Sequence, residues 1–377
     1  MKDQRKFIHF HCFVFLFIIY PFTLSSTEYL TVGGEKYGWE VSVHPDRGTI
    51  KQFRQLMGDV WETIPFRDDS LAGPAWSGMQ LCPSKKQLYV FEAHQGDIYY
   101  TLRYKAAYDH LIVECTISNR GDDVFRPEYS RLFIGVDSEM KTYPDWDTKF
   151  FPTLLRCEKD FAWGYFMSPR QIIMGIGVEE PVASYTLNYV YEGSMEWKWG
   201  HQIKTGSLDL LHCLPLPERH PQNNLSLKPH ETRKWTLHLG VVDRLAGVKE
   251  KLSQWIQAPM IECEKYTMAG HETSRLLIHS QSGLEKLIVK APDGTQSVLP
   301  VDGVADNVYS ALFSPSSQKG LYRITATAIN GKTAEASIYI RNPWSWYMKN
   351  ARDFVARNPP LFSNGCCLLY TSDAADE

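Results

Sequence analysis

Short apolar segments with a period of two fill most of this chain, and they constrain its fold more than any other feature. They recur between residues 27 and 245, with glycine, proline, asparagine and aspartate between them. Such alternation places one face of a strand in a core. The expected strands are 39–43, 87–91, 98–104, 111–117, 130–136, 171–178, 183–190 and 233–242. A mainly β region of this length predicts two large packed antiparallel sheets rather than a small barrel.

A second group of strands follows a short helix. Residues 245–255 have apolar residues at helical spacing, and Pro259 ends the pattern. The chain then returns to short strands joined by aspartate-glycine and asparagine-glycine turns, which are typical of hairpins. The expected strands are 275–279, 285–290, 297–301, 311–313, 320–328 and 334–340. We therefore expect a domain boundary near residue 258 and a separate small β-sandwich over 259–342.

The last part of the chain changes period again. Apolar residues of 344–358 fall on one face of a helix, and Pro359 ends the pattern. We expect this helix to begin a further, truncated helical domain over 343–366. Residues 367–377 resemble the translation of a transposase sequencing adapter, so we expect the gene to be cut off near Cys366 and the chain to be an N-terminal fragment.

The first residues have the pattern of a secretory signal. Lys2, Arg5 and Lys6 precede an apolar run over 7–22, and small residues follow it. The run is shorter than the roughly 20 residues that a spanning helix needs. A signal peptide over 1–26 is predicted, with an uncleaved N-terminal anchor as the alternative. A secreted or periplasmic location follows, and we expect no membrane span after cleavage.

Charge and cysteine spacing argue against several classes of protein. The formal net charge is −3, and basic and acidic residues are interspersed, so no basic surface for nucleic acid is expected. The cysteines between the leader and residue 366 are widely spaced and form no C-x-x-C pair, which disfavours a zinc site or a disulfide scaffold. We expect neither a metal nor a cofactor. Cys115 lies in a strand-like run and is expected to be a buried thiol.

The β region also resembles a known family. Its motifs are a glycine turn at 48–50 before 57–61, the turn at 119–121 after a long strand, and the 227–232 turn before the last strand. In this order they resemble galactose-mutarotase-like supersandwich domains. The resemblance implies that residues 27–258 form one large antiparallel supersandwich, closed by a short helix.

The following region has a resemblance of its own. Residues 320–326 resemble a strand common in small Ig-like β-sandwiches of extracellular bacterial enzymes. A supersandwich, an Ig-like sandwich and helices together resemble carbohydrate-active enzymes whose catalytic part is an (α/α)6 toroid.

The resemblance implies the ancillary N-terminal part of a secreted glycoside hydrolase, because in hydrolases and phosphorylases the supersandwich commonly leads. A polysaccharide lyase fragment and a non-catalytic exported glycan-binding protein are the alternatives. Catalytic residues are not assigned, since the missing toroid would carry them. We expect the chain alone to bind a polysaccharide or oligosaccharide without turning it over.

The first candidate binding segment contains Asp145, Trp146 and Asp147 in a proline-bearing loop. An aromatic ring there would stack on a sugar face, and the carboxylates would bind its hydroxyl groups. A solvated turn is the alternative. Carboxylates separated by one residue rarely span the ~5–10 Å that glycosidases need, so this is not a catalytic pair.

The second candidate segment runs from Glu196 to His201. Trp197 and Trp199 share one face of any extended segment, while Glu196 lies on the other face. Such an aromatic pair would line a glycan groove, with His201 as a polar group in its wall. The alternative is that both rings belong to a sheet core.

Overall fold

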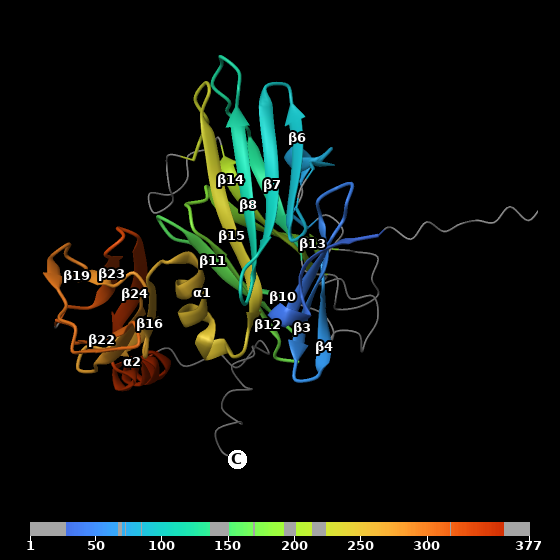
Figure 1. Cartoon of the computed structure of the whole chain (residues 1–377). Helices are drawn as coiled ribbons and strands as arrows, with labels where there is room; N and C mark the ends of the chain where they lie inside the picture. The colour runs from blue at the N-terminus through green and yellow to red at the C-terminus, as the bar shows by residue number, and fades with distance from the viewer. Residues whose placement is uncertain are drawn as a thin grey trace, which may run out of the picture.

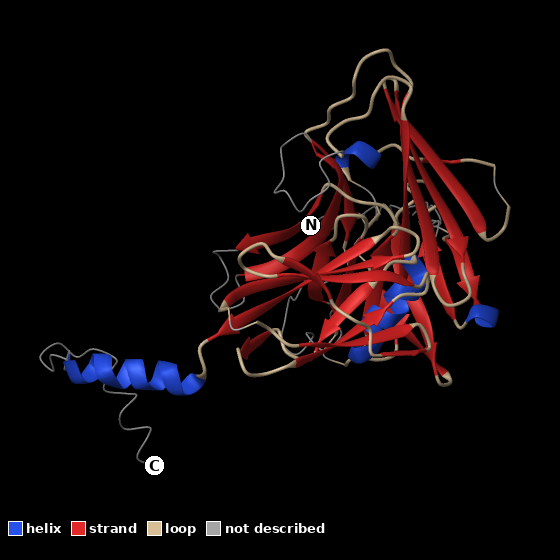
Figure 2. Ribbon diagram, turned by 90° about the vertical axis from the view of Figure 1, so that its left-hand side faces the viewer, coloured by secondary structure: helices blue, strands red, loops and turns tan. Residues whose placement is uncertain are grey.

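The computed structural model describes residues 28–66, 70–71, 73–83, 85–135, 151–168, 170–191, 201–212, 224–316 and 318–357. Within these residues the protein consists mainly of antiparallel sheets, with α-helices as minor elements (Figures 1 and 2). The expected mainly β fold class is therefore confirmed. The expected leader over 1–26 lies outside the described residues.

The largest sheet has the strand order β10-β11-β12-β15-β8-β7-β6-β5, with antiparallel neighbours throughout. Its strands are β5 (Gln80–Leu81), β6 (Leu88–Gln95), β7 (Ile98–Ala106), β8 (Leu111–Asn119), β10 (Phe151–Cys157), β11 (Ala162–Met167), β12 (Ile173–Val178) and β15 (Thr232–Val242). The sequence predicted β6, β7, β8, β12 and β15 to within a few residues. It missed β5, β10 and β11, and β11 lacks alternation because most of its residues are buried.

Two smaller sheets accompany this one in the first β region. One contains β1 (Leu30–Gly34), β2 (Trp39–Val43), β3 (Ile50–Met57) and β4 (Val60–Pro65) in chain order, with a short 3-10 helix η1 (Glu35–Tyr37) between its first strands. The other has the order β13-β14-β9, with β9 (Tyr129–Ile134), β13 (Ser184–Tyr191) and β14 (His201–His212). A second short helix, η2 (Pro74–Trp76), precedes β5.

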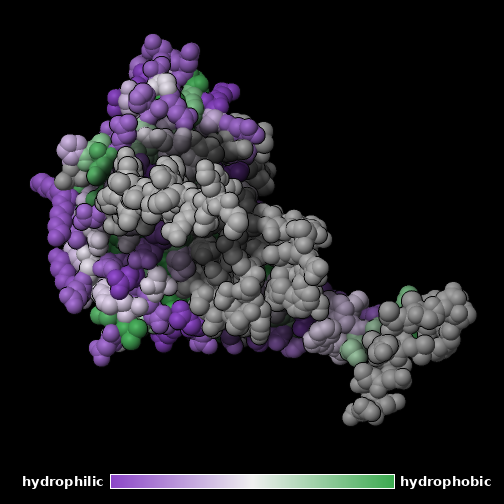
Figure 3. All heavy atoms as spheres, turned by 90° about the vertical axis from the view of Figure 1, so that its right-hand side faces the viewer, coloured by the Kyte–Doolittle hydropathy of each residue, from purple (hydrophilic) through white to green (hydrophobic). Residues whose placement is uncertain are grey.

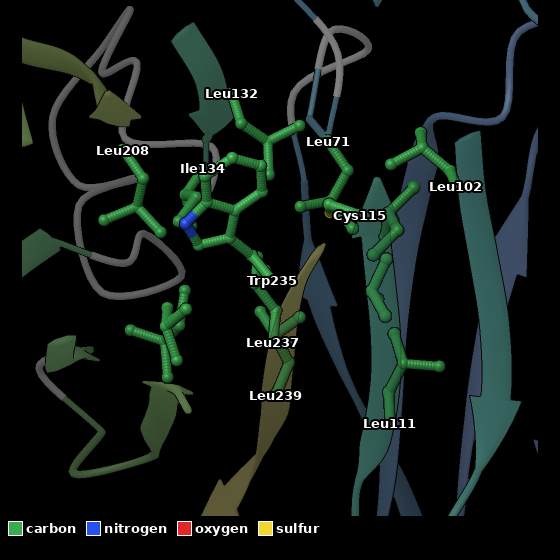
Figure 4. Packing of buried hydrophobic residues seen from close by; sticks show 14 of the residues in the cluster. Leu71, Leu102, Leu111, Cys115, Leu132, Ile134, Leu208, Trp235, Leu237 and Leu239 are labelled. Atoms are coloured by element: carbon green, nitrogen blue, oxygen red, sulfur yellow. The ribbon is translucent and has the colours of Figure 1, made fainter. Parts of the chain in front are cut away.

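One continuous core lies between these sheets, as Figure 4 shows. Trp235 of β15 and Cys115 of β8 point into it from the large sheet, while Leu132 of β9 and Leu208 of β14 enter from the three-stranded sheet. All four are at most 2% exposed. The buried thiol expected at Cys115 is confirmed, and burial raises its pKa. The sheets thus pack face to face through their alternating apolar residues.

The C-terminal β region forms two further sheets. The four-stranded one has the order β16-β18-β22-β21, with β16 (Met260–Cys263), β18 (Ser274–His279), β21 (Gly303–Ala305) and β22 (Val308–Phe313). The five-stranded one has the order β17-β24-β23-β19-β20, with β17 (Thr267–Ala269), β19 (Leu284–Lys290), β20 (Gln296–Val298), β23 (Gly320–Ala328) and β24 (Thr333–Arg341). Among the described residues, neither sheet pairs with the strands of the first region. The proposed division into domains near residue 258 remains a prediction.

A helix joins the two β regions. The chain passes through the 3-10 turn η4 (Leu245–Gly247) into α1 (Val248–Ile256), which lies between the large sheet and the C-terminal sheets in Figure 1. The second core combines Phe161 and Trp163 of the first region with Ile278 and Ile338 of the second. The two regions therefore share buried apolar surface.

Glycines allow α1 to lie close to the large sheet. A Cβ atom added at Gly177 of β12 would lie 2.4 Å from Cγ2 of Ile256, and one added at Gly240 of β15 would lie 2.8 Å from the Trp255 ring. Neither position has a positive φ. The absence of a side chain is therefore needed for close packing rather than for backbone conformation.

The C-terminal helix α2 (Trp344–Arg357) projects from the body of the molecule (Figure 2). None of its residues is buried, and Trp344 and Phe354 are 68% and 67% exposed. Figure 3 shows hydrophobic residues on the surface of this projecting part. The predicted helix is confirmed, whereas its place at the start of a helical domain remains a prediction. Residues 367–377 lie outside the described residues.

Candidate functional site

The three-stranded sheet contains strands that flank the two predicted binding segments in the sequence. Ile134 of β9 pairs with Gly206 of β14, and Tyr191 of β13 pairs with His201 of β14. In this register β9 ends opposite the middle of β14, five residues from His201, whereas the start of β14 lies beside the last residue of β13. One predicted segment follows β9 in the sequence, and the other connects β13 to β14.

Most of the predicted site residues lie outside the described residues. These are Asp145, Trp146, Asp147, Glu196, Trp197 and Trp199. His201 is the first residue of β14, and its backbone pairs with that of Tyr191. The structure therefore brings together the strands next to both segments, and the contacts of the candidate side chains remain predictions.

A buried carboxylate connects all three strands of this sheet. Asp209 of β14 accepts hydrogen bonds from Nε of Arg131 in β9 at 3.0 Å, Oγ of Ser184 in β13 at 2.8 Å and Oγ1 of Thr186 in β13 at 3.2 Å. Its side chain is 2% exposed. A buried ionised carboxylate needs such partners. The group fixes the arrangement of the strands that carry the predicted segments.

The sequence analysis did not identify the Asp209 group. The available signal was a single acidic residue inside the apolar run Leu208-Asp209-Leu210-Leu211. An acid at that place in a strand indicates either a break in the strand or a paired buried charge. Its partners Arg131 and Ser184 are far away in the sequence, so they could not be identified from spacing.

A second polar group crosses the outer face of the large sheet, on which α1 packs. His110 lies in the turn before β8, His238 in β15, and Glu179 directly after β12. Nε2 of His110 lies 2.8 Å from Nδ1 of His238. Nδ1 of His110 lies 2.7 Å from Oδ1 of Asp109, and Nε2 of His238 lies 2.8 Å from Oε1 of Glu179. These contacts form a continuous chain, Asp109–His110–His238–Glu179.

Burial and neighbouring charges set the protonation of these hydrogen-bonded side chains. The hydrogen bond from His110, aided by Lys251, holds the pKa of Asp109 well below its usual range despite partial burial. Burial disfavours ionisation of Glu179, but the hydrogen bond and charge of His238 outweigh it and lower its pKa. Burial lowers the pKa of His110, against the opposing effect of Asp109. Both carboxylates are therefore ionised near neutral pH.

A cavity of about 220 Å³ lies where the end of β10 meets β23 and β24. Charged side chains dominate its walls, including Arg156, Glu158, Lys159 and Glu335. Nε of Arg156 lies 2.5 Å from Oε1 of Glu158, and burial raises the pKa of this glutamate. The cavity is smaller and more polar than typical small-molecule sites. Hydrogen bonds from Arg156 to the backbone oxygen of Glu335 and from the backbone N–H of Glu335 to Glu158 connect the two β regions here.

The described residues contain neither a metal-binding group nor a membrane-spanning helix. No group of three or more histidine, cysteine, aspartate or glutamate side chains in this part of the chain is placed to hold a metal ion. No helix among these residues is long and apolar enough to cross a membrane.

Comparison with known proteins gives a likeness of fold. No protein-family model matches the chain, and no curated protein matches it significantly. Among solved structures, a polysaccharide lyase aligns over 86% of this chain and 49% of its own, with a TM-score of 0.60 and 16% identity. The chain thus spans about half the length of that lyase. At this identity the match shows a shared fold.

Two other solved structures are more distant. A galactose mutarotase related enzyme from Lactobacillus acidophilus is 6% identical, over 57% of this chain and 98% of its own, with a TM-score of 0.34. A putative aldose 1-epimerase from Escherichia coli K12 is 12% identical, over 57% of this chain and 99% of its own, also with a TM-score of 0.34. TM-scores of this size indicate a remote likeness only.

Proposed function

We propose that this chain forms the β-sandwich part of an exported enzyme that acts on polysaccharides. The observation that carries the proposal is the likeness to a polysaccharide lyase over 86% of the chain. That share exceeds either β region alone, so the likeness involves both of them. An exported location agrees with the leader expected over 1–26, since polysaccharide substrates of such enzymes lie outside the cytoplasm.

The reaction we propose is β-elimination on a uronate-containing polysaccharide. The likeness to a lyase supports this alternative over the glycoside hydrolase that the sequence favoured. The hydrolase remains a second candidate because the β regions precede the helix α2. In elimination a base removes the proton next to the uronate carboxyl group, and the glycosidic bond breaks to leave a carbon–carbon double bond. In hydrolysis water adds across the bond, and no double bond forms.

The substrate is proposed to bind at the end of the three-stranded sheet. The Asp209 group joins the three strands further along β14, the segment that contains Trp197 and Trp199 connects β13 to β14 at the proposed end, and the segment that contains Trp146 follows β9 in the sequence. Trp146, Trp197 and Trp199 would stack on sugar rings, while Asp145, Asp147 and Glu196 would bind hydroxyl groups.

We expect a variant with both Trp197→Ala and Trp199→Ala to bind polysaccharide about tenfold or more weakly, because two stacking rings are lost. Affinity electrophoresis through gels containing acidic or neutral polysaccharides measures this. Trp344→Ala is the matched control, since Trp344 is an exposed ring on α2 and should leave binding unchanged. Equal mobility of the double variant and the unchanged protein would rule out the two rings as ligands.

Product analysis separates the two reaction classes wherever turnover occurs. An unsaturated uronate absorbs ultraviolet light, so a rise in absorbance together with new reducing ends identifies elimination. New reducing ends without that absorbance identify hydrolysis.

A further inference from the structure

The hydrogen-bonded series Asp109–His110–His238–Glu179 needs a definite number of protons on its two imidazole rings. Both of its ends are ionised carboxylates, which only accept hydrogen bonds. Nδ1 of His110 and Nε2 of His238 must therefore both carry hydrogen. A neutral imidazole has only one N–H group, so each ring would have used its single hydrogen at its carboxylate.

The remaining two nitrogens face each other. Nε2 of His110 and Nδ1 of His238 are 2.8 Å apart, which is a hydrogen-bond distance. Two lone pairs at that separation would repel, and so would two N–H groups. Only one hydrogen between them gives an attractive contact. The pair therefore holds three protons on four nitrogens, one more than two neutral rings would hold.

The surroundings suit a single positive charge on this pair. The titratable and charged groups around it are Asp109 in the turn before β8, Lys251 of α1, Glu179 and Glu180 after β12, Lys234 of β15 and Lys332 of the β23–β24 turn. Nζ of Lys251 lies 2.6 Å from Oδ2 of Asp109. Within the direct contacts, the shared proton and Lys251 face the two end carboxylates, while Glu180, Lys234 and Lys332 act on Glu179 or beside it without contacting the histidine pair.

This chain of contacts lies at the junction of the two β regions. The ring of Trp255 in α1 stacks on His110 with centroids 4.6 Å apart, and Nε1 of Trp255 lies 3.4 Å from Oδ2 of Asp109. Nζ of Lys332, from the C-terminal sheets, donates to the backbone oxygen of Ile256 at 2.8 Å. The protonation of the histidine pair therefore affects how α1 is held.

We propose that His110 and His238 form a proton-sensitive clamp, which holds α1 on the large sheet with one shared proton and releases it when a second proton is added. A second proton places two N–H groups in opposition at 2.8 Å and adds a charge to a site where both rings are buried. The rings must then separate, and the stack on Trp255 is disturbed.

The pH dependence follows from the burial of His110. Burial lowers its pKa in the folded protein, so the unfolded or opened form takes up the second proton at higher pH. The closed form then binds fewer protons, and its stability falls as the pH drops below about 6.5, the ordinary value for histidine. Acidification in this range should open the junction before it unfolds the strands of the large sheet.

Hydrogen exchange of the α1 amides, corrected for intrinsic rates, tests the clamp between pH 7.5 and 5. We expect protection of 248–256 to fall by up to about tenfold for each pH unit once the second proton is taken up, since one proton is linked to opening. Protection of β7 and β8 should change less. The variant with both His110→Gln and His238→Gln should lose this pH dependence, because neither glutamine side chain titrates.

His94→Gln is the matched control. His94 is an exposed histidine that stacks on Tyr99 at 5.2 Å, away from α1, and its loss should leave the pH dependence intact. The clamp is contradicted if α1 protection does not change over this range, or changes equally in the variant with both His110→Gln and His238→Gln. Nitrogen NMR of the imidazoles tests the unchanged protein independently, and two neutral rings at pH 7 would overturn the proton assignment.

Discussion

Asp209→Ala should lower the free energy of unfolding by about 3–5 kcal/mol, the usual cost of removing one partner of a buried ion pair. Asp209 is 2% exposed and accepts hydrogen bonds from Arg131, Ser184 and Thr186. Its removal leaves the Arg131 guanidinium without this carboxylate and two hydroxyl groups without their acceptor. Urea unfolding followed by circular dichroism measures the loss.

The matched control is Asp302→Ala in the C-terminal region. Asp302 also accepts from an arginine and a serine, Arg275 at 3.2 Å and Ser310 at 2.5 Å, but its side chain is 42% exposed. An exposed pair is worth about 0–1 kcal/mol, so this variant should change stability little. Similar losses for both variants would contradict the view that burial makes Asp209 important for the three-stranded sheet.

Gly177→Val should destabilise the protein by about 1–3 kcal/mol, the typical cost of overpacking a core. Valine favours strands, and removing a glycine from a strand alone would gain roughly 0.5–1 kcal/mol. At this position, however, the first added carbon would lie 2.4 Å from Cγ2 of Ile256, which is fully buried. The steric cost exceeds the propensity gain, and α1 must move away from the sheet.

A control variant and a measurement of α1 make this prediction specific. Gly270→Ala is a control without overlap, because its added Cβ would meet Ile340 at an ordinary 3.8 Å. Hydrogen exchange should show the largest loss of protection in α1 for Gly177→Val and no such loss for the control. An unchanged α1 in Gly177→Val would mean that the helix does not depend on close approach to β12.

The strands that the sequence predicted are those with one buried and one exposed face. β8 shows this best, since its burial alternates at every residue, and its predicted range 111–117 lies inside Leu111–Asn119. β11 and β12 are buried on both faces because α1 and the C-terminal sheets cover the outer side. Of these two strands, the sequence predicted only β12, from its continuous apolar run.

The side-chain groups were much harder to predict than the strands. The histidine pair joins positions 110 and 238, which no local sequence pattern relates. Register explains the contact: Ile112 lies opposite His238, next to the turn that contains His110. Long-range pairing of this kind depends on strand order, which composition and spacing do not determine. The aromatic segments, in contrast, were proposed from local pattern alone.

The most direct test of the proposed function is a crystal structure of the protein with a bound uronate oligosaccharide. We predict that the sugar lies at the end of the three-stranded sheet where β13 ends at Tyr191 and β14 begins at His201, in contact with the segments that contain Trp146, Trp197 and Trp199. An oligosaccharide bound only elsewhere, for example in the cavity beside Arg156, would contradict the proposed site. If no acidic or neutral oligosaccharide binds even at high concentration, the proposed function itself is contradicted.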